Sequence, residues 1–235
     1  PADYFREVIL PHLNRYADFK MQVNKRGYYP KGQGHVTISI KPRHKYPADN
    51  LQEFVKNNVY NEGKIIQTKM HALSSVEGIS HVSKSLINQH IADRMAETAR
   101  QQLKSTINPD LNINSVYTDA ESTGGGIVLW GIASEDPDEI NFMNPVRFGT
   151  DNLIEKGKPA EKIGLETANQ LIDLVNLAVP VDHHLADNLI PLLGLFGGKI
   201  KTDTITQHCL SNIYVTEQFL NCKFKLDEKN ISCGF

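Results

Sequence analysis

Three polar residues of the sequence, His184, Asp187 and Asn188, have the spacing that places side chains on one face of an α-helix. The leucines of the same segment fall on the opposite face. Pro191 lies on the polar stripe, and because proline has no N–H, the carbonyl of Asp187 loses its helical donor. A polar face with a free carbonyl near a helix start suits a ribose or an adenine. A solvated helix face has the same spacing, so both interpretations stay open.

His208 lies where a predicted strand ends and a predicted helix begins. A model imidazole has a pKa of about 6.5, so its neutral form can act as a nucleophile near neutral pH. A helix N-terminus favours that neutral form and offers free N–H groups to a phosphate. A histidine that caps or packs at a helix start gives the same pattern.

Residues 29–34 read Tyr-Pro-Lys-Gly-Gln-Gly. Glycines let a backbone approach a ligand closely, and Lys31 could meet a phosphate. A hairpin turn is the default interpretation of such a segment between two alternating strands. The three glycines at 124–126 lack the lysine of a P-loop and predict a turn. His183 beside His184 would suggest a metal site, but adjacent helical side chains diverge by about 100°.

Hydrophobic periodicity predicts the elements that position these residues. We expect helices over 3–17, with a kink at Pro11, and over 50–58, 83–103, 159–177, 182–196 and 208–220. We expect strands near 19–24, 35–40, 64–73, 113–118, 126–133 and 199–205, and a hairpin-like pair ending at 235. Asp182 is the predicted cap of the helix that carries the polar stripe.

The order helix, strand, turn, strand occurs in residues 3–40 and again in 208–235. This pattern-level repeat predicts an α/β (α+β) fold of repeated modules, each with helices packed on a four-stranded sheet, and a smaller α/β insert domain. The expected division is 1–79 and 179–235 for the repeated modules and 80–178 for the insert.

Composition bounds the class of protein. The 235 residues carry a formal net charge of −2, so any nucleic acid would need a local basic patch rather than a global field. Three cysteines without a CxxC spacing argue against a disulfide scaffold or a structural zinc site and fit a cytoplasmic protein. Apolar runs are too short for a membrane span. The chain begins at Pro1 and enters a helical pattern almost at once, which we interpret as a truncated or processed start.

Taken in order, these stretches resemble the RNA 3'-terminal phosphate cyclase family. The resemblance covers nearly the whole chain and rests on residues 26–34 (RGYYPKGQG), 155–161 (EKGKPAE), 181–188 (VDHHLADN) and 208–213 (HCLSNI). The most specific part is the HLAD segment followed by a strand-end histidine.

The resemblance implies a ligase-class reaction that converts an RNA 3'-phosphate to a 2',3'-cyclic phosphate. ATP first adenylates a histidine, which falls on His208, and AMP then passes to the RNA end. A divalent cation, Mg²⁺ or Mn²⁺, is expected with the ATP phosphates. The sequence does not show which protein groups would bind it. The implied adenylate pocket consists of Pro30, His184, Leu185, Ala186, Asp187 and Asn188.

The sequence also departs from the family's pattern. Asn188 stands where the family usually has glutamine, and Gln33 interrupts a loop that is often three consecutive glycines. Residues 45–60 resemble an insertion, and the family's N-terminal module is absent. Two alternatives therefore remain: a non-catalytic cyclase-like protein of ribosome assembly, and an RNA-binding module of the same fold. The presence of His208 favours the enzyme.

Overall fold

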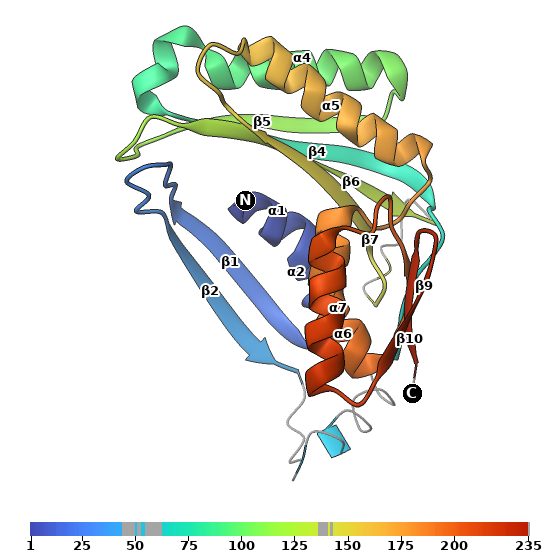
Figure 1. The fold of residues 1–235 in the computed structure, drawn as a ribbon. Coiled ribbons are helices and arrows are strands. Elements are labelled where there is room, and N and C mark those ends of the chain that lie inside the picture. Colours follow the sequence, from blue (N-terminus) through green and yellow to red (C-terminus); the bar gives the residue numbers. More distant parts are fainter. Residues whose placement is uncertain (44–49, 51–52, 55–62, 136–140, 142, 235) are drawn as a thin grey trace.

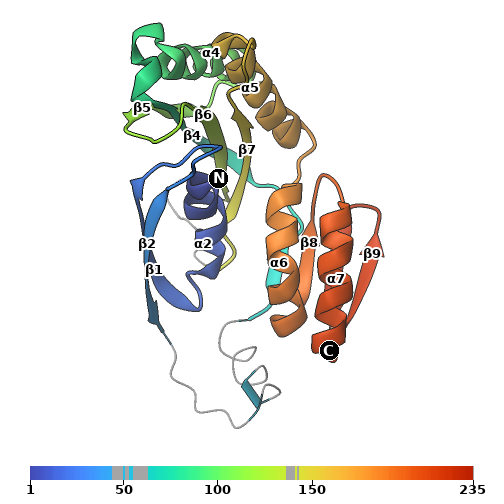
Figure 2. The same cartoon turned by 60° about the vertical axis from the view of Figure 1, so that its left-hand side comes forward.

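The computed structural model describes residues 1–43, 50, 53–54, 63–135, 141 and 143–234 (Figure 1). The strands form two four-stranded sheets and one two-stranded sheet. Helices cover one face of each four-stranded sheet, and the N-terminal helix lies between the sheets (Figures 1 and 2). The expected α/β (α+β) class is confirmed. Among the described residues, no helix combines the length and apolar character needed to cross a bilayer.

The first residues of the chain form a helix followed by a hairpin. The helix consists of α1 (Ala2–Tyr4), a wider π-helical stretch (Phe5–Ile9) and α2 (Leu10–Leu13), and it ends earlier than expected. The π-helical stretch lies directly before Pro11, where we expected a kink. The carbonyl of Glu7, four residues before this proline, accepts a hydrogen bond from Nη1 of Arg147 at 3.0 Å. Strands β1 (Ala17–Lys25) and β2 (His35–Pro42) then pair antiparallel, as the alternation predicted.

The middle of the chain forms the first four-stranded sheet, in the order β5-β4-β6-β7. The strands of this sheet are β4 (Ala72–Ser83), β5 (Asp110–Thr118), β6 (Gly125–Ser134) and β7 (Val146–Leu153). The helices of the same part of the chain are a 3-10 helix (Lys84–Gln89), α4 (Ile91–Thr106) and α5 (Ala160–Asn176). Strand β4 is parallel to β5 and antiparallel to β6. The predicted helix 83–103 is divided at His90, whose φ is +51°. Strand β7 has no counterpart among the predicted elements.

The second four-stranded sheet has the order β3-β8-β10-β9. Its strands are β3 (Ile65–Gln67), β8 (Gly198–Lys201), β9 (Lys223–Asp227) and β10 (Asn230–Gly234). The helices beside it are α6 (His183–Phe196) and α7 (Gln207–Phe219). The predicted strand 64–73 is thus two strands in two different sheets. Since β3 pairs with β8, residues 72–176 lie in the chain between two neighbouring strands of one sheet. The expected boundary at 79/80 falls inside β4, and the division into domains stays a prediction.

The repeated order of helix and hairpin is present at both ends of the chain. α7 is followed by the β9–β10 hairpin, as α2 is followed by β1–β2. The predicted short helix at 50–58 lies almost wholly outside the described residues.

Strand β6 joins the two hydrophobic cores. Its side chains alternate, so Ile127 and Leu129 pack with α4 and α5, whereas Val128 and Trp130 face the core of α6, α7 and the N-terminal helix. This explains why the strand is buried along nearly its whole length. The N-terminal helix is in contact with β6 and β7 of the first sheet and with α6, and it positions the start of α6.

Candidate active site

Asp182 fixes the start of α6. Its Oδ1 accepts hydrogen bonds from the backbone N–H groups of His184 and Leu185 at 2.9 and 3.0 Å, as the predicted N-cap would. The same oxygen accepts a 2.6 Å hydrogen bond from the hydroxyl of Tyr4, and Oδ2 accepts one from the backbone N–H of Gly149 at 2.8 Å. Burial raises the pKa of the Asp182 carboxyl, against these hydrogen bonds, which favour its ionised form. One wholly buried carboxyl thus joins α1, β7 and α6.

His208 is the second residue of α7, and its side chain is exposed. The helix begins at Thr206, whose Oγ1 accepts a hydrogen bond from the backbone N–H of Cys209 at 3.1 Å. The same hydroxyl donates to Oδ1 of Asp187 at 3.0 Å. The polar stripe of α6 and the start of α7 are therefore directly bonded. Both helices begin at the same end of the module (Figure 2).

A second contact joins the two helices at the carbonyl of Asp187. Pro191 removes its helical donor, as the sequence predicted, and Nδ2 of Asn212 donates to it at 3.1 Å. We expected this carbonyl to suit a nucleotide. In the structure it anchors α7 against α6, because the amide of Asn212 replaces the missing backbone N–H, and a contact with a nucleotide stays a prediction.

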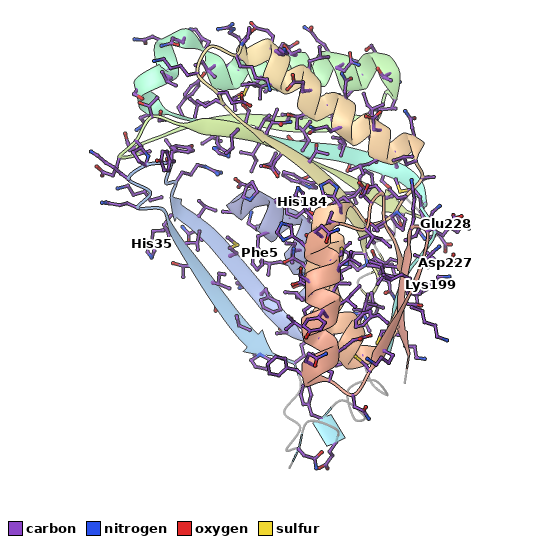
Figure 3. All side chains as sticks on the ribbon, in the orientation of Figure 1. Phe5, His35, His184, Lys199, Asp227 and Glu228 are labelled. Atoms are coloured by element: carbon purple, nitrogen blue, oxygen red, sulfur yellow. The ribbon has the colours of Figure 1, made fainter. Side chains whose placement is uncertain are left out.

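The predicted polar and apolar faces of α6 are as expected. The side chains of Leu185, Ala186 and Leu189 are buried, whereas those of His184 and Asn188 are exposed. Leu185 and Ala186, named for the adenylate pocket, turn their side chains to the core. The exposed polar edge consists of His184, which meets the ring of Tyr4 edge-on at 6.0 Å between centroids, and Asn188 (Figure 3). Nδ2 of Asn188 donates back to the carbonyl of His184 at 2.8 Å.

His183 contacts the segment that leads into α7. Its Nδ1 lies 3.0 Å from Oδ2 of Asp203, and Val181 forms a parallel bridge with Thr202. The hydrogen bond to Asp203 raises the pKa of His183 above its usual value. Burial raises the pKa of Asp203, but the hydrogen bond and charge of His183 outweigh it, so the pKa of this carboxyl is lowered. The two pKa shifts run in opposite directions, so the contact favours the charged form of each side chain.

The ring centroids of His183 and His184 lie only 4.2 Å apart. Adjacent side chains of a helix were expected to diverge by about 100°. The reason is that both rings belong to the first turn, where the side chain of His183 points to Asp203 rather than away from the helix. In the part of the chain that the structure describes, no group of three or more histidine, cysteine or acidic side chains could hold a metal ion.

The loop that carries Pro30 is held by α1. Arg26 forms a two-pronged ion pair with Asp3, with Nη2 and Oδ1 3.0 Å apart, and Arg6 contacts the same carboxylate at 3.2 Å. Burial would raise the pKa of Asp3, but the hydrogen bond and charge of Arg26 lower it overall. Because Tyr4, the next residue, bonds to Asp182, two successive residues of α1 connect the loop with the start of α6.

The other side of this loop packs on the first sheet. The hydroxyl of Tyr28 lies 2.9 Å from Nδ1 of His81 in β4, and the two rings are stacked. A Cβ at Gly124 would come within 2.4 Å of the Tyr28 ring, so this glycine permits the contact. The backbone N–H of Lys31 donates to Oγ of Ser122 at 3.1 Å. The residues on either side of Pro30 are thus held by α1 and by the end of the first sheet, whereas Pro30 itself is exposed, and its contact with a nucleotide stays a prediction.

A cavity of about 500 Å³ lies at the end of the first sheet. It includes residues 155–160 of the EKGKPAE stretch. Two of its cations are already paired, because Arg94 binds Glu161 at 2.6 Å and Lys158 binds Glu166 at 2.5 Å. These pairs leave the cavity with little net positive charge for an anion, so we place the candidate site at α6 and α7.

Sequence reasoning missed four residues of this arrangement: Tyr4, His183 as an ion-pair partner, Asp203 and Thr206. Tyr4 and Asp182 are 178 positions apart, and no local pattern links them. Thr206 could have been found, because a threonine just before a predicted helix is a common N-cap.

The fold and the site together define an α+β protein of helix–hairpin modules. It presents an exposed imidazole at the start of one helix, and that helix start is hydrogen-bonded to the polar stripe of a neighbouring helix. The chain belongs to the RNA 3'-terminal phosphate cyclase family, whose sequence profile matches residues 1–226.

Curated relatives agree with this assignment. The chain is 31% identical over 229 residues to the RNA 3'-terminal phosphate cyclase of Thermococcus onnurineus. It is 33% identical over 233 residues to that of Pyrobaculum aerophilum and 34% identical over 231 residues to that of Methanococcoides burtonii. Each match covers 97% of this chain and 59% of the relative, so the chain spans less than two thirds of the length of these relatives.

Proposed function

We propose that this chain carries the nucleophile of an ATP-dependent RNA 3'-terminal phosphate cyclase, a cytoplasmic ligase-class enzyme, and that His208 is the adenylated residue. The observation that carries the proposal is the hydrogen bond between Thr206 and Asp187. It joins the start of α7, two residues before the exposed His208, to Asp187 on the polar stripe of α6, which supports a shared site.

The reaction would proceed in three steps. A neutral ring nitrogen of His208 attacks the α-phosphorus of ATP, and pyrophosphate leaves, which gives a protein–AMP phosphoramidate. The RNA 3'-phosphate then attacks this phosphorus and takes up AMP, which restores the imidazole. Finally the neighbouring 2'-hydroxyl attacks the RNA phosphorus, the 2',3'-cyclic phosphate forms, and AMP leaves with the electron pair of the broken bond.

The chain's own groups supply orientation and charge. The exposed side chains of His184 and Asn188 would contact the adenosine, with Pro30 on the other side of α1. The first N–H groups of α7 would face the α-phosphate, since a helix N-terminus favours an anion. A divalent cation would arrive with the ATP phosphates.

Incubation of the full-length protein with ATP labelled at the α-phosphate tests the proposal. We expect an acid-labile, hydroxylamine-sensitive protein–AMP adduct that His208→Ala abolishes. The matched control is His35→Ala, which removes an exposed histidine of β2, remote from His184 (Figure 3). An adduct that survives His208→Ala, or no adduct in the unaltered protein, would refute the assignment.

Asp187→Ala provides a second test. The substitution removes the acceptor of the Thr206 hydroxyl but no side chain of the apolar core, so adenylation should fall while the protein stays folded. Asp187→Asn keeps an oxygen for Thr206 and should retain more of the rate. Unfolding of Asp187→Ala at room temperature, followed by circular dichroism, would show that Asp187 is structural instead.

A further inference from the structure

The segment between β8 and α7 lies directly before the helix that carries His208, and three contacts join it to Val181 and to the first turns of α6. Thr202 bridges to Val181, Asp203 pairs with His183, and Thr206 donates to Asp187. The second of these bonds is the one between oppositely charged side chains. It lies five residues before His208, so its state affects where α7 begins.

Acidic groups surround His183 on the elements packed against it. Asp203 lies on the incoming segment, Asp182 caps α6, and Asp187 lies one turn further along the helix. The ring of His184 is a further titratable neighbour, at 4.2 Å. The three carboxylates favour the imidazolium form of His183. The side chain of Asp203 is only 13% exposed, so the pair is partly shielded from solvent.

We propose that His183 is a positioning residue for His208: its ion pair with Asp203 fixes residues 202–206 on α6 so that α7 presents the nucleophile beside the polar edge. This inference rests on the proposed function for its catalytic consequence. The structural part, an ion pair that orders the segment before α7, can be measured without any reaction.

The ion pair should make the site sensitive to alkaline pH. Because the folded-state pKa of His183 is raised, the pair is intact below the usual histidine value and is lost as the pH rises through the raised pKa. The segment should then loosen, and adenylation should slow on the alkaline side. Other groups set the acidic side of the profile.

The first experiment measures amide hydrogen exchange of residues 202–206 in the full-length protein across this pH range. We expect exchange to accelerate, relative to α4, in His183→Ala and in the unaltered protein at alkaline pH. His71→Gln is the matched control, because His71 also faces a carboxylate, Glu135 at 3.5 Å, but lies just before β4 of the first sheet. Unchanged exchange in His183→Ala would overturn the inference whether or not an adduct forms.

The second experiment measures the rate of protein–AMP formation against pH. His183→Ala should lower the rate at least about tenfold near neutral pH, the size of effect expected from a misplaced nucleophile. Asp203→Asn should move the alkaline limb to lower pH, and His183→Lys, which keeps a cation, should restore the rate and extend it to higher pH. A wild-type rate in His183→Ala, or a limb that neither variant moves, would refute the role.

Discussion

Asp182→Ala should destabilise the protein strongly, although the residue is a single polar group at the start of α6. The change removes the N-cap, which costs about 1 kcal/mol. It also leaves the hydroxyl of Tyr4 and the backbone N–H of Gly149 buried without their acceptor, at about 1–3 kcal/mol each. Removal of a buried carboxyl returns part of this energy, since burial opposes its ionised form. We expect a net loss of about 3–5 kcal/mol.

Urea unfolding followed by circular dichroism measures this loss. Tyr4→Phe removes only the phenolic hydroxyl and should cost about 1–2 kcal/mol. In a double-mutant cycle with Asp182→Ala, the two changes should couple by about 1–2 kcal/mol, because they remove one shared hydrogen bond. Asp173→Ala, at an exposed position of α5, is the control and should change stability by less than about 0.5 kcal/mol.

The reasoning would be refuted by a loss below about 1 kcal/mol in Asp182→Ala, the value of a helix cap alone. Additive effects of the two substitutions would equally show that Tyr4 and Asp182 do not stabilise one another. Either result would remove the argument that α1 positions the start of α6.

Two further predictions concern the core. Leu189→Ala should lower the unfolding free energy in urea by about 2–5 kcal/mol, since Leu189 is buried in the α6 core. The control Leu177→Ala, at an exposed leucine, should lower it by less than about 1 kcal/mol. Equal losses would mean that the assigned face of α6 is wrong. Burial and the charges of Arg147 and Arg15 lower the pKa of His12 to about 3, so His12 stays neutral in the fold and stability should fall as the pH drops from about 6.5 towards 3. At pH 4.5 the unfolding free energy should be lower by about 2–3 kcal/mol because of His12, and His12→Gln should remove this loss. An unchanged pH dependence of the urea midpoint in His12→Gln would show that His12 is not the cause.

Elements with a strong local pattern were predictable from the sequence. Alternating Phe19, Met21 and Val23 indicated β1, and Asp182 indicated the first residue of α6. Their signals come from neighbours within one turn or one strand. The exposed position of His208 at the start of α7 follows from the same kind of signal.

Elements that depend on distant partners were not predictable. In β7, Gly149, Asp151 and Asn152 obscure the apolar pattern, and the strand exists because it pairs with β6. The single strand expected at 64–73 became two, since β3 pairs with β8 while β4 pairs with β5 and β6. The pair of His183 and Asp203 likewise depends on the bridge between residues 181 and 202, which only the folded chain brings together.

The two helical prolines have an effect opposite to the usual one of interrupting a helix. Pro11 and Pro191 each leave an acceptor without a backbone donor, and in both cases a side chain from another element, Arg147 or Asn212, donates to it. Each proline therefore turns a bond that would have been local into a tertiary one. Alanine at either position would restore a backbone donor, and the side chain from the neighbouring element would then share the carbonyl with it.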